Sequence, residues 1–304
     1  MIYPHVSLDG DAVGSSVALC KALRIAGKEA YVLIEDNVPL NLRFMEKDYF
    51  TKDLDIIASV DISICVDCGD LGRFPARKDK FLQGRTTICI DHHQTNEELC
   101  DYNYVDSKAS ATGELIFELL MSMGTAPDTE IGEAIFAAIT TDTGNFQYSN
   151  TTKRCFEIMA ELLNWGTDTN KVSVEIYENE RPEKKLIESR ALSTLEIIGG
   201  GKGAIAYITQ KMLNETGALS EETDQIVQQL RSIAGVEYAA FLKEKDSDLV
   251  RVSLRAKREG NVADIATKLG GGGHIKAAGC TLHMSIDDAV QTVKKELIKN
   301  INKL

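Results

Sequence analysis

The chain has 304 residues, of which 43% are hydrophobic and 26% are charged, a composition typical of a soluble protein with about two domains. No apolar run approaches the roughly 20 residues that a helix needs to cross a bilayer, and no signal peptide opens the chain. We therefore expect a cytoplasmic protein that does not bind membranes. The formal net charge of −12 argues against binding of long duplex nucleic acid, because such binding requires many basic groups that neutralise phosphates.

Strand-like and helix-like segments alternate through the first 180 residues, a pattern that predicts parallel βαβ units. Short apolar runs predict the strands, and apolar residues at helical spacing predict the helices. The predicted strands are 30–34, 62–66 and 87–90, and the predicted helices are 11–26, 112–123, 129–141, 153–165 and 168–178. A charged helix that opens at Arg181-Pro182 and extends to about residue 198 is expected to act as a linker.

The second half of the chain predicts a smaller α/β domain with its own mixed sheet. Its predicted strands are 204–209, 236–243, 250–256 and 278–282, and its predicted helices are 221–233, 262–269 and 286–300. Charge also differs between the halves. Residues 1–180 contain 15 Lys and Arg against 30 Asp and Glu, whereas residues 199–304 contain 15 against 13. The first half is therefore expected to bind cations, and the second half is able to hold an anion.

Four acidic clusters of the first half lie next to predicted strand or helix ends. Parallel strands present their carboxyl ends at one edge of a sheet, where ligands bind. If the clusters meet there, hard carboxylates with a few imidazoles suit Mn²⁺ or Mg²⁺, and bound cations would offset the repulsion between the carboxylates. Any one of these Asp residues could be a simple helix cap or turn residue, but this explanation is improbable for all four. The clusters are His5 to Asp11, Asp67, Asp91-His92-His93, and Asp142.

A local basic patch lies in the second half, where residues 251–280 contain six Lys and Arg against two Asp and Glu. Along the predicted strand 250–256, Arg251 and Arg255 alternate with apolar residues and so share one face. The following glycine run, residues 270–273, allows backbone amides to approach an anion closely. A flexible loop is the alternative explanation of this run. His274 adds a side-chain donor, and we predict phosphate binding by Arg255 and this segment.

The seven cysteines are expected to be reduced thiols rather than a disulfide framework. Cys65 and Cys68 have CxxC spacing, but they span the end of a predicted strand and have no second pair. We therefore interpret them as core or near-site thiols.

Together the motifs resemble the DHH phosphoesterase superfamily. The first-half motifs are HxxxDGDxxGS from His5, VD at Asp67, DHH at Asp91 and TDTGxF around Asp142, and the run from Gly270 resembles the DHHA1 domain. Within the superfamily, the two-domain length is most similar to bacterial oligoribonucleases (nanoRNases) that also dephosphorylate 3′-phosphoadenosine-5′-phosphate. The resemblance implies a DHH metal-binding catalytic domain at 1–180, a linker helix at 181–198 and a DHHA1 substrate-binding domain at 199–304, with the active site in the cleft between the domains.

The resemblance also implies two divalent metal ions, with Mn²⁺ favoured over Mg²⁺ and Co²⁺. Asp67 would bridge the two ions. Asp91 would orient an imidazole, and His93 would face the substrate phosphate. Substrate would be bound by Arg255, Gly271, Gly272, Gly273 and His274. One metal would be held by His5, Asp9 and Asp67, and the other by Asp11, Asp67, His92 and Asp142.

The activity that the resemblance implies is hydrolysis of very short single-stranded RNA to 5′-mononucleotides, together with dephosphorylation of 3′,5′-bisphosphonucleotides. One alternative is a phosphodiesterase for cyclic dinucleotides or linear dinucleotides, and another is a catalytically silent nucleotide sensor. A homodimer is also possible. The chain departs from the family in two places. Only Met1 to Pro4 precede His5, where members usually have a helix and a full strand, and Leu8 occupies a position that is usually Pro.

Overall fold

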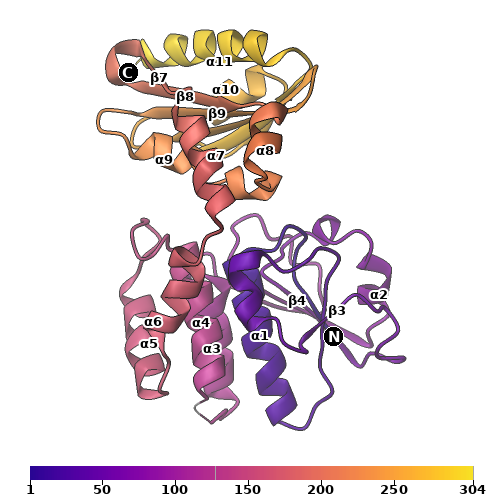
Figure 1. The fold of residues 1–304 in the computed structure, drawn as a ribbon. Coiled ribbons are helices and arrows are strands. Elements are labelled where there is room, and N and C mark those ends of the chain that lie inside the picture. The colour runs from indigo at the N-terminus through magenta and orange to yellow at the C-terminus, as the bar shows by residue number, and fades with distance from the viewer. Residues whose placement is uncertain (127, 304) are drawn as a thin grey trace. The chain divides into compact units, whose positions relative to one another are not determined.

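The computed structural model describes residues 1–126 and 128–303 of the chain. It contains two compact units, Met1–Asn179 and Glu180–Leu304, which are drawn in Figure 1. The first unit contains a parallel sheet and the second contains a mixed sheet, so the predicted fold class is confirmed. None of the described helices is long and apolar enough to cross a membrane.

The first unit is built on a six-stranded sheet in the order β3-β2-β1-β4-β5-β6. All of its pairings are parallel, so every strand ends at the same edge, and loops that follow the strands converge there. The strands are β1 (Ile2–Tyr3), β2 (Val32–Leu33), β3 (Phe50–Thr51), β4 (Ile62–Val66), β5 (Thr86–Asp91) and β6 (Tyr102–Val105).

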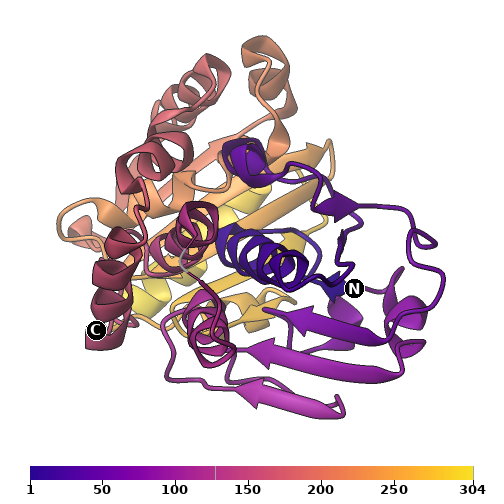
Figure 2. The same cartoon turned by 90° about the horizontal axis from the view of Figure 1, so that it is seen from below.

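Helices cover both faces of this sheet. On one face, α1 (Gly10–Ile25), α3 (Thr112–Ser122) and α4 (Thr129–Asp142) share an apolar core with the strands, and Figure 2 shows α1, in indigo, beside the sheet. On the other face, the short helix α2 (Lys78–Leu82) contributes to a smaller core with Tyr3 and Phe74. The unit closes with α5 (Lys153–Asn164), α6 (Thr169–Ser173) and a π-helical turn at Val174–Glu178.

The packing of α1 against α4 is unusually close at Gly14. A Cβ atom at this position would lie 2.3 Å from the Ala134 carbonyl oxygen, so only glycine fits. This contact fixes the position of α1. It therefore also fixes Asp11, in the first turn of α1, at the edge of the sheet.

The short segment before His5 forms a central strand. Ile2 pairs with Val32 of β2 on one side and with Ile64 of β4 on the other, and the amino group of Met1 donates to the Ile62 carbonyl at 2.9 Å. Two strand residues are therefore enough to place His5 at the carboxyl edge, where its side chain is buried.

The second unit contains a six-stranded mixed sheet in the order β11-β12-β10-β9-β8-β7. Only the β8–β9 pair is parallel among its described pairings. One face packs on α10 (Ala263–Lys268) and α11 (Ile286–Ile301). The other packs on α7 (Pro182–Leu192), α8 (Gln210–Thr216) and α9 (Ile226–Ser232). The strands are β7 (Glu196–Ile198), β8 (Gly203–Ile208), β9 (Tyr238–Asp246), β10 (Leu249–Ala256), β11 (Gly272–Gly273) and β12 (Ala277–Leu282).

The predicted helix 182–198 is too long by six residues. It ends at Leu192, and residues 196–198 form β7, an edge strand that pairs antiparallel with β8. Thr194 fixes the turn between α7 and β7. Its hydroxyl accepts a hydrogen bond from the Tyr207 amide at 2.9 Å and donates one to the Tyr207 carbonyl at 3.0 Å. The predicted helix 221–233 is also interrupted, by the end of a 3₁₀ turn at Thr223. The assignment of 1–180, 181–198 and 199–304 to separate roles stays a prediction.

Candidate active site

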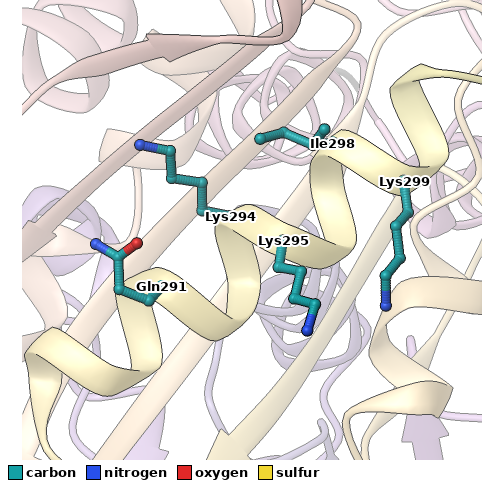
Figure 3. Close-up of a pocket in the computed structure, with 5 residues that line it drawn as sticks. All are labelled: Gln291, Lys294, Lys295, Ile298 and Lys299. Atoms are coloured by element: carbon teal, nitrogen blue, oxygen red, sulfur yellow. The ribbon is translucent and has the colours of Figure 1, made fainter.

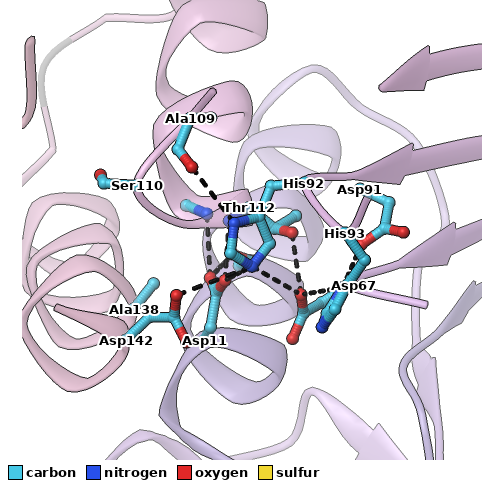
Figure 4. Close-up of polar contacts among 12 residues, drawn as sticks. Asp11, Asp67, Asp91, His92, His93, Ala109, Ser110, Thr112, Ala138 and Asp142 are labelled. Carbon is cyan, nitrogen blue, oxygen red and sulfur yellow. Dashed lines mark hydrogen bonds and ion pairs between the residues drawn. The ribbon is translucent and has the colours of Figure 1, made fainter. Parts of the chain in front are cut away.

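The four acidic clusters come together at the carboxyl edge of the first sheet. His5 follows β1, Asp67 follows β4, Asp91 ends β5, and Asp142 ends α4; Figure 4 shows most of this cluster. Within the described residues, three overlapping groups of side chains have ligand atoms within 4.8 Å of one another and could hold a metal ion. The groups are His5, Asp9 and Asp67; Asp67, His92 and His93; and Asp11, His92 and Asp142.

Asp67 occupies the centre of the cluster. Its Oδ2 lies 3.4 Å from Nε2 of His5, and its Oδ1 lies 3.8 Å from Nε2 of His92 and 3.6 Å from Nδ1 of His93. The side chain is buried, and the backbone has a φ of 57°, a left-handed conformation that turns the chain sharply after β4. The two carboxylate oxygens of Asp67 therefore face different imidazoles, an arrangement that suits a bridging ligand.

Two histidines present Nε2 to the carboxylates. Nδ1 of His5 lies 2.7 Å from the Val6 carbonyl oxygen, and Nδ1 of His92 lies 3.3 Å from the Ala109 carbonyl oxygen. A carbonyl can only accept, so each Nδ1 carries the proton in the neutral ring and Nε2 is left with its lone pair. This is the usual arrangement of a metal-binding histidine.

Asp11 is held by the N-terminus of α3. Its oxygens accept from the backbone amides of Thr112 at 2.7 Å and Gly113 at 2.9 Å, and from the Ser15 hydroxyl at 2.8 Å. The Thr112 hydroxyl also donates to Asp67. Sequence reasoning missed these three residues, although the free amides at the start of the predicted helix 112–123 were a signal, since helix N-termini bind anions.

Asp9 performs two tasks. Its Oδ1 accepts from the Ala12 amide at 3.0 Å and so caps α1, while its Oδ2 lies 3.6 Å from Nε2 of His5. The alternative explanation of this residue as a helix cap is thus correct, and the same carboxylate still reaches the cluster with its second oxygen.

Asp91 orients His93. Its Oδ1 lies 2.7 Å from Nδ1 of His93, its Oδ2 accepts from the Asn96 amide group at 2.6 Å, and it is fully buried. Asn96 was not predicted from the sequence. Asn150 was also missed, and it donates to Oδ2 of Asp142 at 3.3 Å and to the Ser110 carbonyl at 2.9 Å. Asn side chains in loops carry no local pattern that indicates such contacts.

The electrostatics of the cluster favour bound cations. Burial, followed by repulsion from Asp67 and Asp142, raises the pKa of Asp11 well above its usual range. Burial, opposed by His92 and reinforced by Asp67, raises the pKa of Asp142 to about 6. Within the described part of the first unit, the ion pairs of these carboxylates are with histidines alone. Buried carboxylates need compensating charge, and divalent metal ions fit this set of oxygen and nitrogen donors.

In the second unit, the predicted face of β10 is confirmed. Val252 and Leu254 are buried, Arg251 is exposed, and Arg255 is half-buried with its Nη1 donating to its neighbour's carbonyl oxygen at 3.0 Å. Lys276, another basic residue of this patch, donates to the carbonyl oxygens of Arg258 and Gly260, so its ammonium group is occupied by the backbone.

Part of the glycine run forms an edge strand, since β11 is Gly272–Gly273. β11 pairs with β12, and the His274 amide donates to the Ala277 carbonyl at 2.7 Å. A Cβ at Gly271 would lie 2.2 Å from the Gly279 carbonyl oxygen, whereas a Cβ at Gly272 would meet nothing within 4 Å. Close pairing therefore explains Gly271, and residues 271–274 remain exposed to solvent.

A basic surface on α11 was not predicted. A shallow pocket of about 300 Å³ is lined by Gln291, Lys294, Lys295, Ile298 and Lys299 (Figure 3). Lys294 pairs with Glu196 and Lys299 pairs with Glu296. These lysines are therefore part of a surface charge network.

A parallel sheet with clustered carboxylate and imidazole groups at its carboxyl edge suits the binding of divalent metal ions, and the family match makes this protein a metal-dependent phosphoesterase. The chain belongs to the DHH family: residues 1–141 match the model of the DHH family, N-terminal domain, and residues 199–302 match that of the DHHA1 domain.

Three known proteins show how close the relationship is. The chain is 31% identical to the bifunctional oligoribonuclease and PAP phosphatase NrnA of Thermus thermophilus, over 98% of this chain and 90% of the relative. It is 27% identical to the enzyme of the same name from Bacillus subtilis, over 95% and 90%. A crystal structure of an exopolyphosphatase-related protein from Bacteroides fragilis superposes with a TM-score of 0.92 at 27% identity, covering 99% of this chain and 92% of that one.

Proposed function

We propose that this enzyme hydrolyses very short oligoribonucleotides to 5′-mononucleotides and removes the 3′-phosphate from 3′,5′-bisphosphonucleotides. The proposal rests mainly on one observation. The complete set of predicted metal ligands lies in three overlapping groups around Asp67, in a chain that aligns over nearly its whole length with relatives that bear both activities in their name.

The proposed ligand set holds two divalent cations, with Mn²⁺ preferred. When bound, such ions lower the pKa of a coordinated water and neutralise charge on the phosphate. Asp67 is proposed to contribute to both sites, since its two oxygens face different histidines. The first site is assigned to His5, Asp9 and Asp67, and the second to Asp11, Asp67, His92 and Asp142.

His93 and Asp91 are proposed to act on the substrate rather than on a metal. Asp91 accepts from Nδ1 of His93, so Nε2 remains available to a phosphate oxygen. In the charged ring both nitrogens are donors. The hydrogen bond to Asp91 raises the pKa of His93, and burial lowers it by less, so the pKa is raised overall. The raised pKa favours the charged ring, which can donate to a phosphate oxygen from Nε2.

The second unit is proposed to bind the remaining phosphate of the substrate through Arg255 and the segment Gly271, Gly272, Gly273 and His274. Enzymes that track long single strands combine a basic groove with many aromatic side chains. This chain carries a net charge of −12 and has 6% aromatic residues, so substrates of two to about five nucleotides are preferred over longer strands.

The test is product analysis at fixed ionic strength with a labelled length series from dimer to 20-mer, a 3′,5′-bisphosphonucleotide and a cyclic dinucleotide. Fast cleavage of dimers and of the bisphosphonucleotide, with a steep decline beyond about five nucleotides, supports the proposal. A 20-mer that is cleaved as well as the dimer would exclude it, and preferred turnover of the cyclic dinucleotide would reassign the substrate class.

A further inference from the structure

Three thiols lie close together on one face of the first sheet, and the proposed function uses none of them. Cys65 of β4 and Cys89 of β5 are register partners on neighbouring strands, and both are buried. Cys100, just before β6, is half-buried. Sγ of Cys65 lies 3.8 Å from Sγ of Cys100. The partner of Cys65 is thus 35 residues further along the chain and not Cys68, the cysteine at CxxC spacing.

We propose that Cys65 and Cys100 are a modification site for peroxides, at which a reversible disulfide forms and lowers the turnover of the enzyme. The reaction balances in two steps. The Cys100 sulfur attacks hydrogen peroxide, which releases one water and leaves a sulfenic acid. The Cys65 sulfur then attacks the oxidised sulfur, and a second water leaves as the S–S bond forms. Two thiols have lost two electrons, and the peroxide has gained them.

Cys100 is the thiol that meets the oxidant. It is the more exposed of the pair, and thiolate character together with exposure decides which cysteine reacts. Hydrogen bonds from Cys65 and then Cys89 lower the pKa of Cys100. Sγ of Cys65 lies 3.8 Å from Sγ of Cys100, so Cys65 can react with the sulfenic acid to form the disulfide.

Formation of the Cys65–Cys100 disulfide requires Cys100 and its loop to move. The two sulfur atoms must approach from 3.8 Å to about 2.05 Å, and Cys65 is fixed in a central strand. The backbone of Cys100 is held by the side chain of Asn103, which accepts from its amide at 3.3 Å and donates to its carbonyl at 2.8 Å. Asp101, the next residue, is anchored to Thr87 by three hydrogen bonds. The Asn103 side chain also donates to the Glu98 carbonyl at 3.2 Å, so a shift of Cys100 is expected to be transmitted to residues 93–99.

That loop holds the orienting contacts of the active site. The Asn96 side chain donates to Oδ2 of Asp91 at 2.6 Å and to Sγ of Cys89 at 3.2 Å, and the Asn96 amide donates to the His93 carbonyl at 3.2 Å. Displacement of Asn96 would loosen Asp91 and therefore His93. All proposed metal ligands, including the neighbouring His92, lie outside residues 93–99, so bound metal is retained while turnover falls. This consequence rests on the proposed function, whereas formation of the bond does not.

The experiment treats the metal-loaded full-length enzyme with hydrogen peroxide and compares three readouts: non-reducing peptide mapping by mass spectrometry, bound Mn²⁺, and turnover of a generic phosphodiester. We expect a Cys65–Cys100 cross-linked peptide, unchanged Mn²⁺ content and a several-fold loss of turnover that dithiothreitol reverses. Cys100→Ser should be resistant, and Cys280→Ser, which changes a buried thiol of the second unit, should be as sensitive as the wild type.

The proposal is overturned if no disulfide forms, if it joins another pair of thiols, or if the Cys65–Cys100 protein retains full turnover. A Cys100→Ser protein that still loses activity reversibly would also overturn it. Because peptide mapping does not depend on substrate, a wrong assignment of the substrate leaves the cross-link result intact. Cys100→Ala repeats the comparison if the serine variant folds poorly.

Discussion

The hydroxyl of Thr112 donates to Oδ1 of Asp67 across 2.9 Å, although the two residues are 45 positions apart in the chain. The same residue donates its backbone amide to Asp11. Thr112 therefore couples the N-terminus of α3 to two of the proposed metal ligands at once. It fixes the orientation of the Asp67 carboxylate, which is proposed to present different oxygens to the two metal sites.

Thr112→Val should weaken metal binding without unfolding the protein. Valine keeps the shape of threonine and leaves the amide contact to Asp11 in place, while one hydrogen bond to Asp67 is lost. Loss of such an orienting contact typically costs about 10–100-fold in metal affinity or activity. Titration of the metal-free protein with Mn²⁺ measures the effect. Thr112→Ser, which keeps the hydroxyl, is the matched control, and equal affinities in the two variants would contradict the assigned role.

Metal affinity should rise with pH. In the metal-free protein, burial disfavours the charged form of His5, but hydrogen bonds and charge from Asp67 and Asp9 outweigh it and raise the pKa to about 10. The pKa of Asp142 is raised to about 6. Metal must displace these protons, so binding is accompanied by proton release. Calorimetry in buffers of different ionisation enthalpy measures the released protons, and a pH-independent affinity would argue against these ligands.

The same shifts determine how the stability of the metal-free protein depends on pH. Folding raises the pKa of both groups. The contribution of His5 to the free energy of unfolding is complete below its ordinary pKa of 6.5 and is lost as the pH rises through about 10. That of Asp142 is complete below 3.8 and is lost as the pH rises through about 6. These two groups should therefore lower the stability of the metal-free protein as the pH rises from about 4 to about 10, and Mn²⁺ should raise the Tm more at about pH 8 than at about pH 6. Thermal unfolding at both pH values, with and without Mn²⁺, tests this, and an equal increase in Tm at both is the contrary result.

The second unit should affect substrate use and leave metal content unchanged. Arg255→Ala and His274→Ala each remove a proposed charge-assisted contact to phosphate worth about 1.5–3 kcal/mol, so kcat/KM should fall by about 10- to 150-fold. Lys295→Ala, which removes an exposed charge on α11, is the control for net charge. If either of the first two variants loses bound Mn²⁺ but keeps its KM, this division of roles is wrong.

Within the glycine run, packing and function can be separated. Gly271→Ala places a Cβ against the Gly279 carbonyl and should destabilise the protein by about 1–3 kcal/mol. Gly272→Ala has open space and should leave the Tm nearly unchanged. Equal losses of Tm in the two variants would show that β11 does not pair with β12 as described.

Sequence patterns predicted the parts of the fold that local chemistry determines. β4 and β5 are apolar runs that lead directly into Asp67 and Asp91, so both strands were correctly located, and these two candidate site residues lie at their ends. β6 was missed because Tyr102 and Tyr104 lie exposed on an edge strand, with no apolar run to indicate it. Residues such as Thr112, Asn96 and Asn150 were missed for another reason: their partners are distant in sequence, and only the assembled sheet brings them together.

The central claim is that Asp67 is shared by two metal sites, and Asp67→Asn tests it most directly. Asparagine keeps the size of the side chain and tolerates the left-handed backbone at this position, so the fold should survive. The measurement is the number of Mn²⁺ ions bound per chain, together with turnover of a dinucleotide. We predict two ions for the wild type, fewer for the variant, and less than about a tenth of wild-type turnover, equivalent to a barrier increase of more than about 1.4 kcal/mol. A variant that binds two ions and exceeds that turnover would contradict the assignment.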